Sequence, residues 1–178
     1  MTERLFIAIF PPEDVIDSLI DDMADLPGVN WQGEDQLHLT LRFLGDVDRR
    51  QRDELIDLLT TIDFSPFDIE LGGGDAFRQR DRIKSIHRQV QPNEPLLRLA
   101  RAIDRRCEMA GLGTRDRHFL PHITLARLNA SSPDMENYIA GLAGKLGPGF
   151  TADRFTLVSS HLGHAGAQYE PLVDFLAT

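Results

Sequence analysis

The chain has 178 residues, 42% of them hydrophobic and 26% charged, which is enough for one well-buried domain or two small lobes sharing an interface. Its formal net charge of −9 argues against broad, sequence-independent nucleic-acid binding, and no apolar run approaches the length of a membrane span. Cys107 is the only cysteine, which excludes an internal disulfide and a cysteine-based metal site. We therefore expect a cytoplasmic protein without a membrane association.

The first half of the chain alternates predicted strands and helices. Its N-terminal apolar stretch is too short for a signal peptide and predicts a strand over residues 4–10. The next segment predicts a helix over 11–23, because proline and acidic residues suit the first turn and apolar residues follow at helical spacing. The remaining elements of this half are a strand over 37–44 closed by Gly45-Asp46, a helix over 48–62 and a strand over 67–71.

The second half repeats this pattern after a glycine run. Residues 72–75 read Gly-Gly-Gly-Asp, lack the ending of a phosphate-binding loop, and predict a turn or bulge. The elements expected next are strands over 82–90 and 121–128, helices over 93–111 and from 132 to near 144, and a terminal strand pair over 155–160 and 169–175. This duplication predicts an α+β fold in which residues 1–178 form one bilobal domain, with two similar lobes flanking a groove.

One short motif occurs twice, at matching places in the two halves. Residues 38–41 read His-Leu-Thr-Leu and residues 122–125 read His-Ile-Thr-Leu, both with the composition of strands. Chance alone would give roughly 0.3 His-x-Thr matches in this composition, so two copies in strand context are a specific signal. Because alternate strand side chains share a face, each histidine points the same way as its threonine while the aliphatic residues enter the core.

Positive charge gathers in the middle of the chain. Residues 77–127 carry twelve Lys/Arg and five Asp/Glu, so this part holds +7 and the remainder −16. A small phosphate could bind in such a basic region. Arg127 follows the second motif and Arg42 follows the first, so the two histidines are expected to have similar charged neighbours. Four further arginines are expected on a solvated helix face: Arg98, Arg101, Arg105 and Arg106.

These motifs resemble those of the two-histidine (2H) phosphoesterase superfamily, most closely its RNA 2′,3′-cyclic phosphodiesterases, historically called 2′-5′ RNA ligases (LigT-like). The resemblance implies the bilobal α+β LigT-like fold, two lobes of antiparallel sheet with helices and an active site in the central groove. One strand, 82–88, is basic and polar where the family usually has an apolar strand with Trp and Gly, which bears on substrate preference. The matching segments are 4–9, 37–45, 119–127 and 166–172.

Opening a cyclic phosphodiester requires one group to deprotonate water and another to protonate the leaving ribose oxygen. Histidine suits both tasks near neutral pH. The resemblance implies His122 as the general base and His38 as the general acid. Thr40 and Thr124 could donate hydrogen bonds to the non-bridging oxygens, and Arg127 could add a charged contact. No metal or other cofactor is expected, because no carboxylate or cysteine shares either motif.

The leading hypothesis is therefore a metal-independent enzyme that hydrolyses 2′,3′-cyclic phosphates of RNA ends or nucleotides to 2′-phosphates, with reverse 2′-5′ RNA ligase activity as an option. One alternative is a phosphodiesterase for another small substrate, such as an ADP-ribose cyclic phosphate or a 2′-5′ linkage. Another is a non-catalytic RNA- or nucleotide-binding module, which would not need two titratable groups. We expect a monomer.

The other histidines rank lower as candidates. His161 and His164 lie in a glycine-containing segment and predict an exposed loop rather than a metal site. His118 is expected at the rim of the groove or on the surface. His87 could line the groove from the basic strand and Tyr169 could stack or simply pack, but neither is counted among the site residues.

Overall fold

The computed structural model describes residues 2–163 and 166–178. The strands are β1 (Thr2–Ile9), β2 (Asn30–Trp31), β3 (Leu39–Asp48), β4 (Phe67–Gln79), β5 (Arg82–Val90), β6 (His122–Arg127), β7 (Gly149–Ala152), β8 (Arg154–Gly163) and β9 (Gly166–Leu176). The helices are α1 (Glu13–Asp21), the 3-10 turn η1 (Glu34–Gln36), α2 (Arg49–Leu59), α3 (Glu94–Met109) and α4 (Glu136–Ala143). Every strand and helix expected from the sequence is present, with shifted ends, and β2, β7 and η1 are additional.

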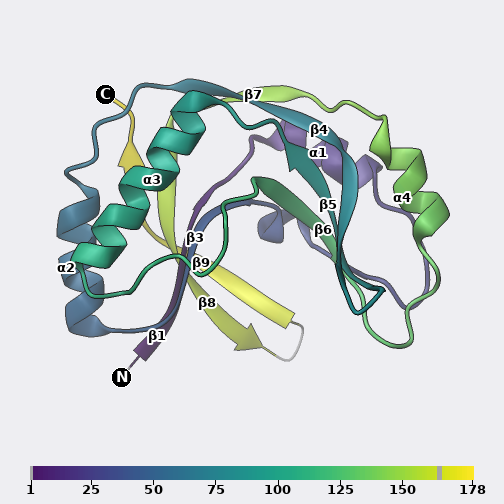
Figure 1. The fold of residues 1–178 in the computed structure, drawn as a ribbon, viewed down its shortest axis with the longest axis horizontal. Helices are drawn as coiled ribbons and strands as arrows, with labels where there is room; N and C mark the ends of the chain where they lie inside the picture. Colours follow the sequence, from purple (N-terminus) through teal and green to yellow (C-terminus); the bar gives the residue numbers. More distant parts are fainter. Residues whose placement is uncertain (1, 164–165) are drawn as a thin grey trace.

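All strand pairs among the described residues are antiparallel and form one curled sheet in the order β7-β4-β5-β6-β3-β1-β8-β9 (Figure 1). Strand β2 lies off this path and pairs with β6. The sheet divides into two halves of similar order, β3-β1-β8-β9 and β6-β5-β4-β7, which meet through a single pair, Leu39 with Ile123. The prediction of an α+β fold with two similar antiparallel lobes is therefore confirmed.

Helices cover one face of this sheet. Helices α2 and α3 pack together against β3, and α4 packs against β4 (Figure 1). The main core lies beneath them and includes the inward residues of both motifs, Leu39, Leu41, Ile123 and Leu125, all fully buried. The opposite face, called the open face below, carries a small apolar cluster drawn from β1, the residue after it, β8 and β9: Phe6, Ala8 and Val158, with Phe10 and Tyr169 packed against them.

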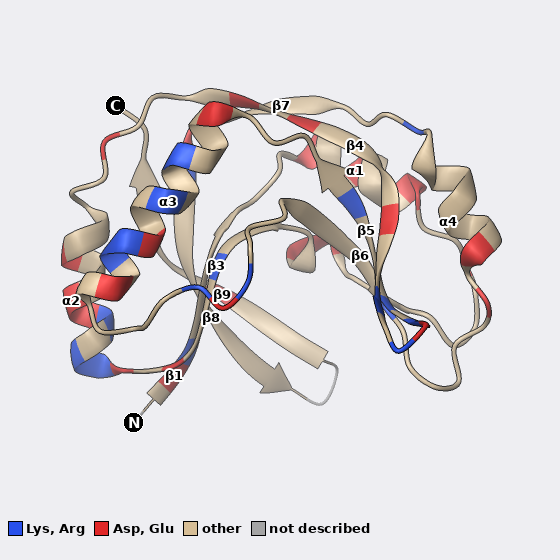
Figure 2. Cartoon of the chain, viewed as in Figure 1, with Lys and Arg blue, Asp and Glu red and all other residues tan. Residues whose placement is uncertain are grey.

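Positively charged residues are found on particular elements of the fold. Figure 2 shows Lys and Arg along α3 and at the β4–β5 hairpin. Arg98, Arg101 and Arg105 are exposed and Arg106 is half-buried, so the expected solvated helix face is largely confirmed. No helix within residues 2–163 and 166–178 is long and apolar enough to cross a bilayer.

Each motif strand contains a β-bulge at the same place. Thr40 pairs with Ala8 and Arg42 with Ile7, so Leu41 is the extra residue of β3. In β6 the pairs are Thr124 with His87 and Ala126 with Ile86, which makes Leu125 the extra residue. A bulge places two consecutive side chains on one face. The side chains that return to the open face after the two bulges are accordingly Phe43 and Arg127.

Two glycine segments differ from the sequence expectation. Strand β3 does not end at Gly45-Asp46 but continues to Asp48, because Gly45 adopts a φ of 73° at a second bulge. Residues 72–75 are not a loop, since β4 runs through them with a bulge between Leu71 and Gly74. The bulge prediction is right and the turn prediction is wrong. The expected helix from residue 132 begins only at Glu136.

The glycines of β4 allow a helix backbone to approach the strand. A Cβ atom on Gly73 would overlap the carbonyl oxygen of Ala143 at the end of α4, and one on Gly74 would overlap the Leu142 side chain. Gly73→Ala should therefore lower the free energy of unfolding by about 1–3 kcal/mol, the usual cost of overpacking. Urea unfolding would measure this loss. Gly144→Ala is the matched control, because nothing lies within contact distance of a Cβ there; equal stabilities of the two variants would contradict the packing argument.

Candidate active site

The two motif histidines lie where the halves of the sheet meet. His38 immediately precedes β3, His122 begins β6, and the pair Leu39–Ile123 lies between them. Because Leu39 and Ile123 point into the core, the residues beside them point to the open face. Antiparallel pairing then sets His38 across from Thr124 and His122 across from Thr40. The fold thus brings together all four motif residues that the sequence singled out.

Both imidazoles are held by the same backbone contact. His38 Nδ1 lies 2.8 Å from the carbonyl oxygen of Gln36, and His122 Nδ1 lies 2.6 Å from that of Leu120, two residues upstream in each case. A carbonyl oxygen can only accept, so each Nδ1 must donate its hydrogen. In the neutral ring this leaves the lone pair on Nε2, and in the protonated ring Nε2 carries the second hydrogen. Nε2 is therefore the nitrogen of each ring that can exchange a proton with a ligand.

Aromatic side chains enclose His38. Its ring centroid lies 4.8 Å from that of Phe6, 5.7 Å from Phe10 and 5.3 Å from Tyr169, which meets it edge-on. This burial lowers the pKa of His38 to about 4, against the opposing effect of the Gln36 carbonyl. The positive charges of Arg127 and His122 lower it further.

His122 has different neighbours. Its ring centroid lies 4.8 Å from Phe77 of β4 and 5.0 Å from a third histidine, His87 of β5. Burial lowers the pKa of His122, the hydrogen bond to Leu120 opposes that shift, and the charge of Arg127 adds to it. Both motif histidines are thus biased toward the neutral form in the free protein, and an anion bound between them would reverse that bias.

The remaining expected site residues also lie on the open face. Thr40 and Thr124 are half-buried, and within the described residues neither hydroxyl makes a hydrogen bond, so both can donate to a ligand. Arg127 is exposed and its charge acts on both histidines. Arg42 does not have this role, and the expectation of similar charged neighbours is wrong. The bulge at Leu41 turns Arg42 to the covered face, where its guanidinium contacts Asp104 and the carbonyl oxygen of Gly113.

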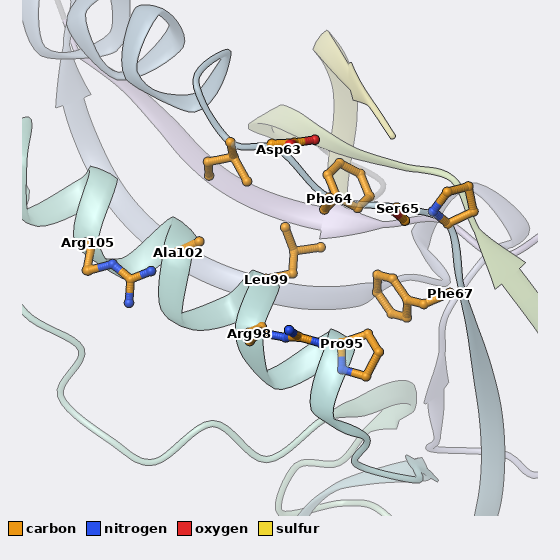
Figure 3. Close-up of a pocket in the computed structure, with 11 residues that line it drawn as sticks. Asp63, Phe64, Ser65, Phe67, Pro95, Arg98, Leu99, Ala102 and Arg105 are labelled. Atoms are coloured by element: carbon orange, nitrogen blue, oxygen red, sulfur yellow. The ribbon is translucent and has the colours of Figure 1, made fainter. Parts of the chain in front are cut away.

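Cavities lie beside the site residues. One of about 660 Å³ is lined by Arg127 and by Tyr169 and Gln36, which contact His38. The other, of about 330 Å³, is lined by His122, His87, Phe77 and neighbouring residues. A third cavity, of about 440 Å³ between α3 and the segment after α2, is lined by Arg98, Leu99 and Phe64 but by none of the site residues (Figure 3). Residues 2–163 and 166–178 contain no cluster of three or more His, Cys, Asp or Glu suited to a metal.

The fold also places beside the pair three residues that the sequence analysis did not count among the site residues. His87, Phe77 and Tyr169 contact the motif histidines from three different strands. His87 and Tyr169 had a recognisable signal, since His87 lies on the predicted basic strand and Tyr169 lies in the matching segment 166–172, whereas Phe77 had none. His161 is exposed as expected, but the prediction of a loop there is wrong, since it lies on β8 beside Glu170. His118 is exposed, as expected, whereas His164 lies outside the described residues.

A two-lobed antiparallel sheet with one His-x-Thr strand from each lobe at its junction defines a two-histidine phosphoesterase. Comparison with known proteins agrees. A model of the 2′-5′ RNA ligase superfamily matches residues 11–164, and the chain belongs to that family. It is 32% identical to an RNA 2′,3′-cyclic phosphodiesterase of Thermus thermophilus, over 97% of this chain and 89% of that protein.

Solved structures give the same relationship. The crystal structure of a Thermus thermophilus protein, TT0787, matches with a TM-score of 0.83 and 29% identity over 97% of each chain. The structure of E. coli LigT complexed with 3′-AMP matches with a TM-score of 0.80 and 25% identity, covering 100% of this chain and 99% of that one.

Proposed function

We propose that this protein hydrolyses the 2′,3′-cyclic phosphates of RNA ends and nucleotides to 2′-phosphates, without a metal ion. The observation that carries the proposal is the pair of histidines at the lobe junction, each with Nδ1 bound to a carbonyl oxygen so that Nε2 is free to exchange protons. The names of the relatives support the substrate class, since the Thermus thermophilus relative is an RNA 2′,3′-cyclic phosphodiesterase.

In the proposed reaction His122 Nε2 takes a proton from water, whose oxygen attacks phosphorus. The P–O3′ bond breaks, and His38 Nε2 gives a proton to the departing 3′ oxygen, which leaves the phosphate on the 2′ oxygen. Thr40, Thr124 and Arg127 stabilise the charge that grows on the non-bridging oxygens. After the reaction His122 is protonated and His38 is neutral, and proton exchange with solvent restores the starting states.

Because both halves of one chain supply the histidines, we also propose that a monomer is active and that residues 1–178 act as one bilobal domain. A reducing cytoplasm suits Cys107, a free thiol buried on the inner side of α3.

A turnover assay with excess EDTA tests the proposal. The panel should contain nucleoside 2′,3′-cyclic phosphates, an RNA with a cyclic phosphate end, an ADP-ribose cyclic phosphate and a 2′-5′-linked dinucleotide. We expect hydrolysis of the first two, with the phosphate left on the 2′ oxygen, and activity unaffected by EDTA. Loss of activity on chelation, restored by a divalent cation, would contradict the metal-independent mechanism. Preference for either of the last two substrates would favour the alternative small-substrate phosphodiesterase.

The lowered pKa values predict an unusual pH dependence. The profile of kcat/KM reports the free enzyme and should be bell-shaped, because one histidine must be neutral and the other protonated. Since burial lowers the pKa of both, that of His38 to about 4, the optimum should lie below pH 6.5. The bound phosphate favours both protonated rings, so the kcat profile should lie at higher pH. An optimum of kcat/KM above pH 7 would contradict this reasoning.

A further inference from the structure

His87 lies against the catalytic pair without belonging to either motif. It pairs with Thr124 across β5 and β6 and shares the open face with it. Its ring stacks on Phe77 with centroids 4.4 Å apart and planes at 26°. The same ring meets His122 at 5.0 Å and 60°. His122 is therefore held from one side by two rings, Phe77 and His87, which themselves form a stack.

The surroundings of His87 favour the neutral ring. The residue is only 5% exposed, and its Nδ1 is buried without a hydrogen-bond partner in the described residues. A protonated imidazole has two N–H donors, so protonation would leave one buried and unpaired. Burial and the charge of His122 lower the pKa of His87 to about 4. Asp75 of β4 opposes this, but its two carboxylate oxygens already accept hydrogen bonds from Ala76 N and Gln89 Nε2.

At the matching position of the other lobe there is no histidine. The position matching His87 is Ala8, which pairs with Thr40 as His87 pairs with Thr124. His38 is instead enclosed by Phe6, Phe10 and Tyr169. The third imidazole is thus a specific feature of the His122 side, where the proposed reaction needs a neutral base.

We propose that His87 is a positioning residue for His122: a neutral ring that, stacked on Phe77, fixes the orientation of the His122 imidazole and keeps water from that side of it. The expected loss of activity rests on the proposed function, whereas the expected effect on the His122 ring does not. The groups that face His122 are His87 from β5, His38 beside β3 and Arg127 from its own strand; Asp75 of β4 faces His87.

Two substitutions separate ring packing from imidazole chemistry. His87→Ala removes the ring and admits water, whereas His87→Phe keeps a flat ring that cannot titrate. We expect His87→Ala to lower kcat by about 10- to 100-fold, as for small displacements of a catalytic group, with a smaller change in KM. The kcat/KM profile should shift to higher pH, because a hydrated His122 binds protons more readily. His87→Phe should retain both the rate and the pH profile.

Titration of the His122 ring by NMR, assigned with His122→Ala, provides a readout that needs no substrate. We expect the His122 midpoint to rise in His87→Ala and to stay unchanged in His87→Phe. His87→Ser is a second ring-free variant in case His87→Ala does not fold, and exposed His118→Ala is the control for loss of a histidine.

An unchanged rate and midpoint in the ring-free variants would overturn the proposal. So would a His87→Phe variant as impaired as His87→Ala, which would assign direct chemistry to the imidazole. If no cyclic phosphate is turned over but the NMR midpoint moves as expected, the proposed function fails and the positioning role stands.

Discussion

Replacing His38 or His122 with alanine is expected to lower kcat for cyclic phosphate hydrolysis by about 10²–10⁴-fold, the usual contribution of a general acid or base. Each change removes the Nε2 atom that exchanges a proton in the proposed mechanism. Steady-state assays at the optimum pH of the unchanged protein would measure the loss. Both side chains lie on the open face rather than in the main core, so circular dichroism should show an intact fold.

Three comparisons control this result. Thr40→Val and Thr124→Val should each cost less than about 4 kcal/mol of transition-state stabilisation, since each removes a single hydrogen-bond donor. His118→Ala, which removes an exposed histidine, should retain full activity. The double variant His38→Ala/His122→Ala should be about as inactive as either single variant, because the two groups act together. Near-normal turnover by that double variant would refute the two-histidine mechanism.

The roles of the two histidines can be separated with an activated leaving group that needs no protonation. Under the proposed assignment His38→Ala should recover much of its rate on such a substrate, and His122→Ala should not. This test is informative because of the surroundings of His38 in the free protein. They lower its pKa to about 4, so the ring is mostly neutral, and cannot act as an acid, before substrate binds. The acid role of His38 therefore requires the phosphate anion to raise that pKa. Recovery of His122→Ala instead would reverse the assignment.

Much of the fold could be predicted because the sequence pattern and the fold obey the same constraint. Each motif alternates residues that enter the core with residues that face a ligand. Leu39 and Ile123, the two residues that pair at the junction, are both core-facing residues of this alternation. Once two such strands pair at the junction of the lobes, the four polar residues of the motifs must gather on one face. The site was thus predictable from local pattern plus duplication.

The errors arise where a distant partner decides the local structure. Alternation alone places Arg42 on the face of Thr40, but the bulge between the pairs with Ile7 and Ala8 reverses it, and this register with β1 is not visible in the sequence of β3 alone. The glycines of residues 72–75 look like a turn until α4 is known to pack on them. The basic composition of strand 82–88 likewise does not indicate that Arg88 enters the core while His87 lies on the open face.

Arg88 leads to the largest expected effect on stability. Its side chain is 1% exposed and its guanidinium donates to three acceptors: Asp22 at 2.8 Å and the carbonyl oxygens of Gly72 and Lys145 at 3.0 and 2.6 Å. Asp22 is the C-cap residue of α1 and also accepts from Lys145 at 2.5 Å. This network ties α1 and the segment after α4 to β4 and β5, the strands that support His122.

Removing one partner of a buried ion pair usually costs about 3–5 kcal/mol, because the other charge is left unpaired away from water. The two partners should not cost the same here. Arg88→Met leaves Asp22 paired with Lys145, whose half-exposed side chain can follow it, so the loss should lie near the lower end. Asp22→Ala leaves Arg88 with two carbonyl oxygens and no counter-charge, so that loss should lie near the upper end.

Urea unfolding near pH 7 would measure both, with Arg82→Met, an exposed arginine at the start of the same strand, as the control that should change stability by less than about 0.5 kcal/mol. The double variant Asp22→Ala/Arg88→Met should lose less than the sum of the single losses, since it leaves no uncompensated buried charge. Arg88→Lys should also be less stable than the unchanged protein, because a single ammonium cannot reach three acceptors held at the geometry of a guanidinium. A loss of unfolding free energy below about 1 kcal/mol for both single variants would show that water reaches the network. It would also show that burial of this ion pair does not stabilise the lobe that contains β4 and β5.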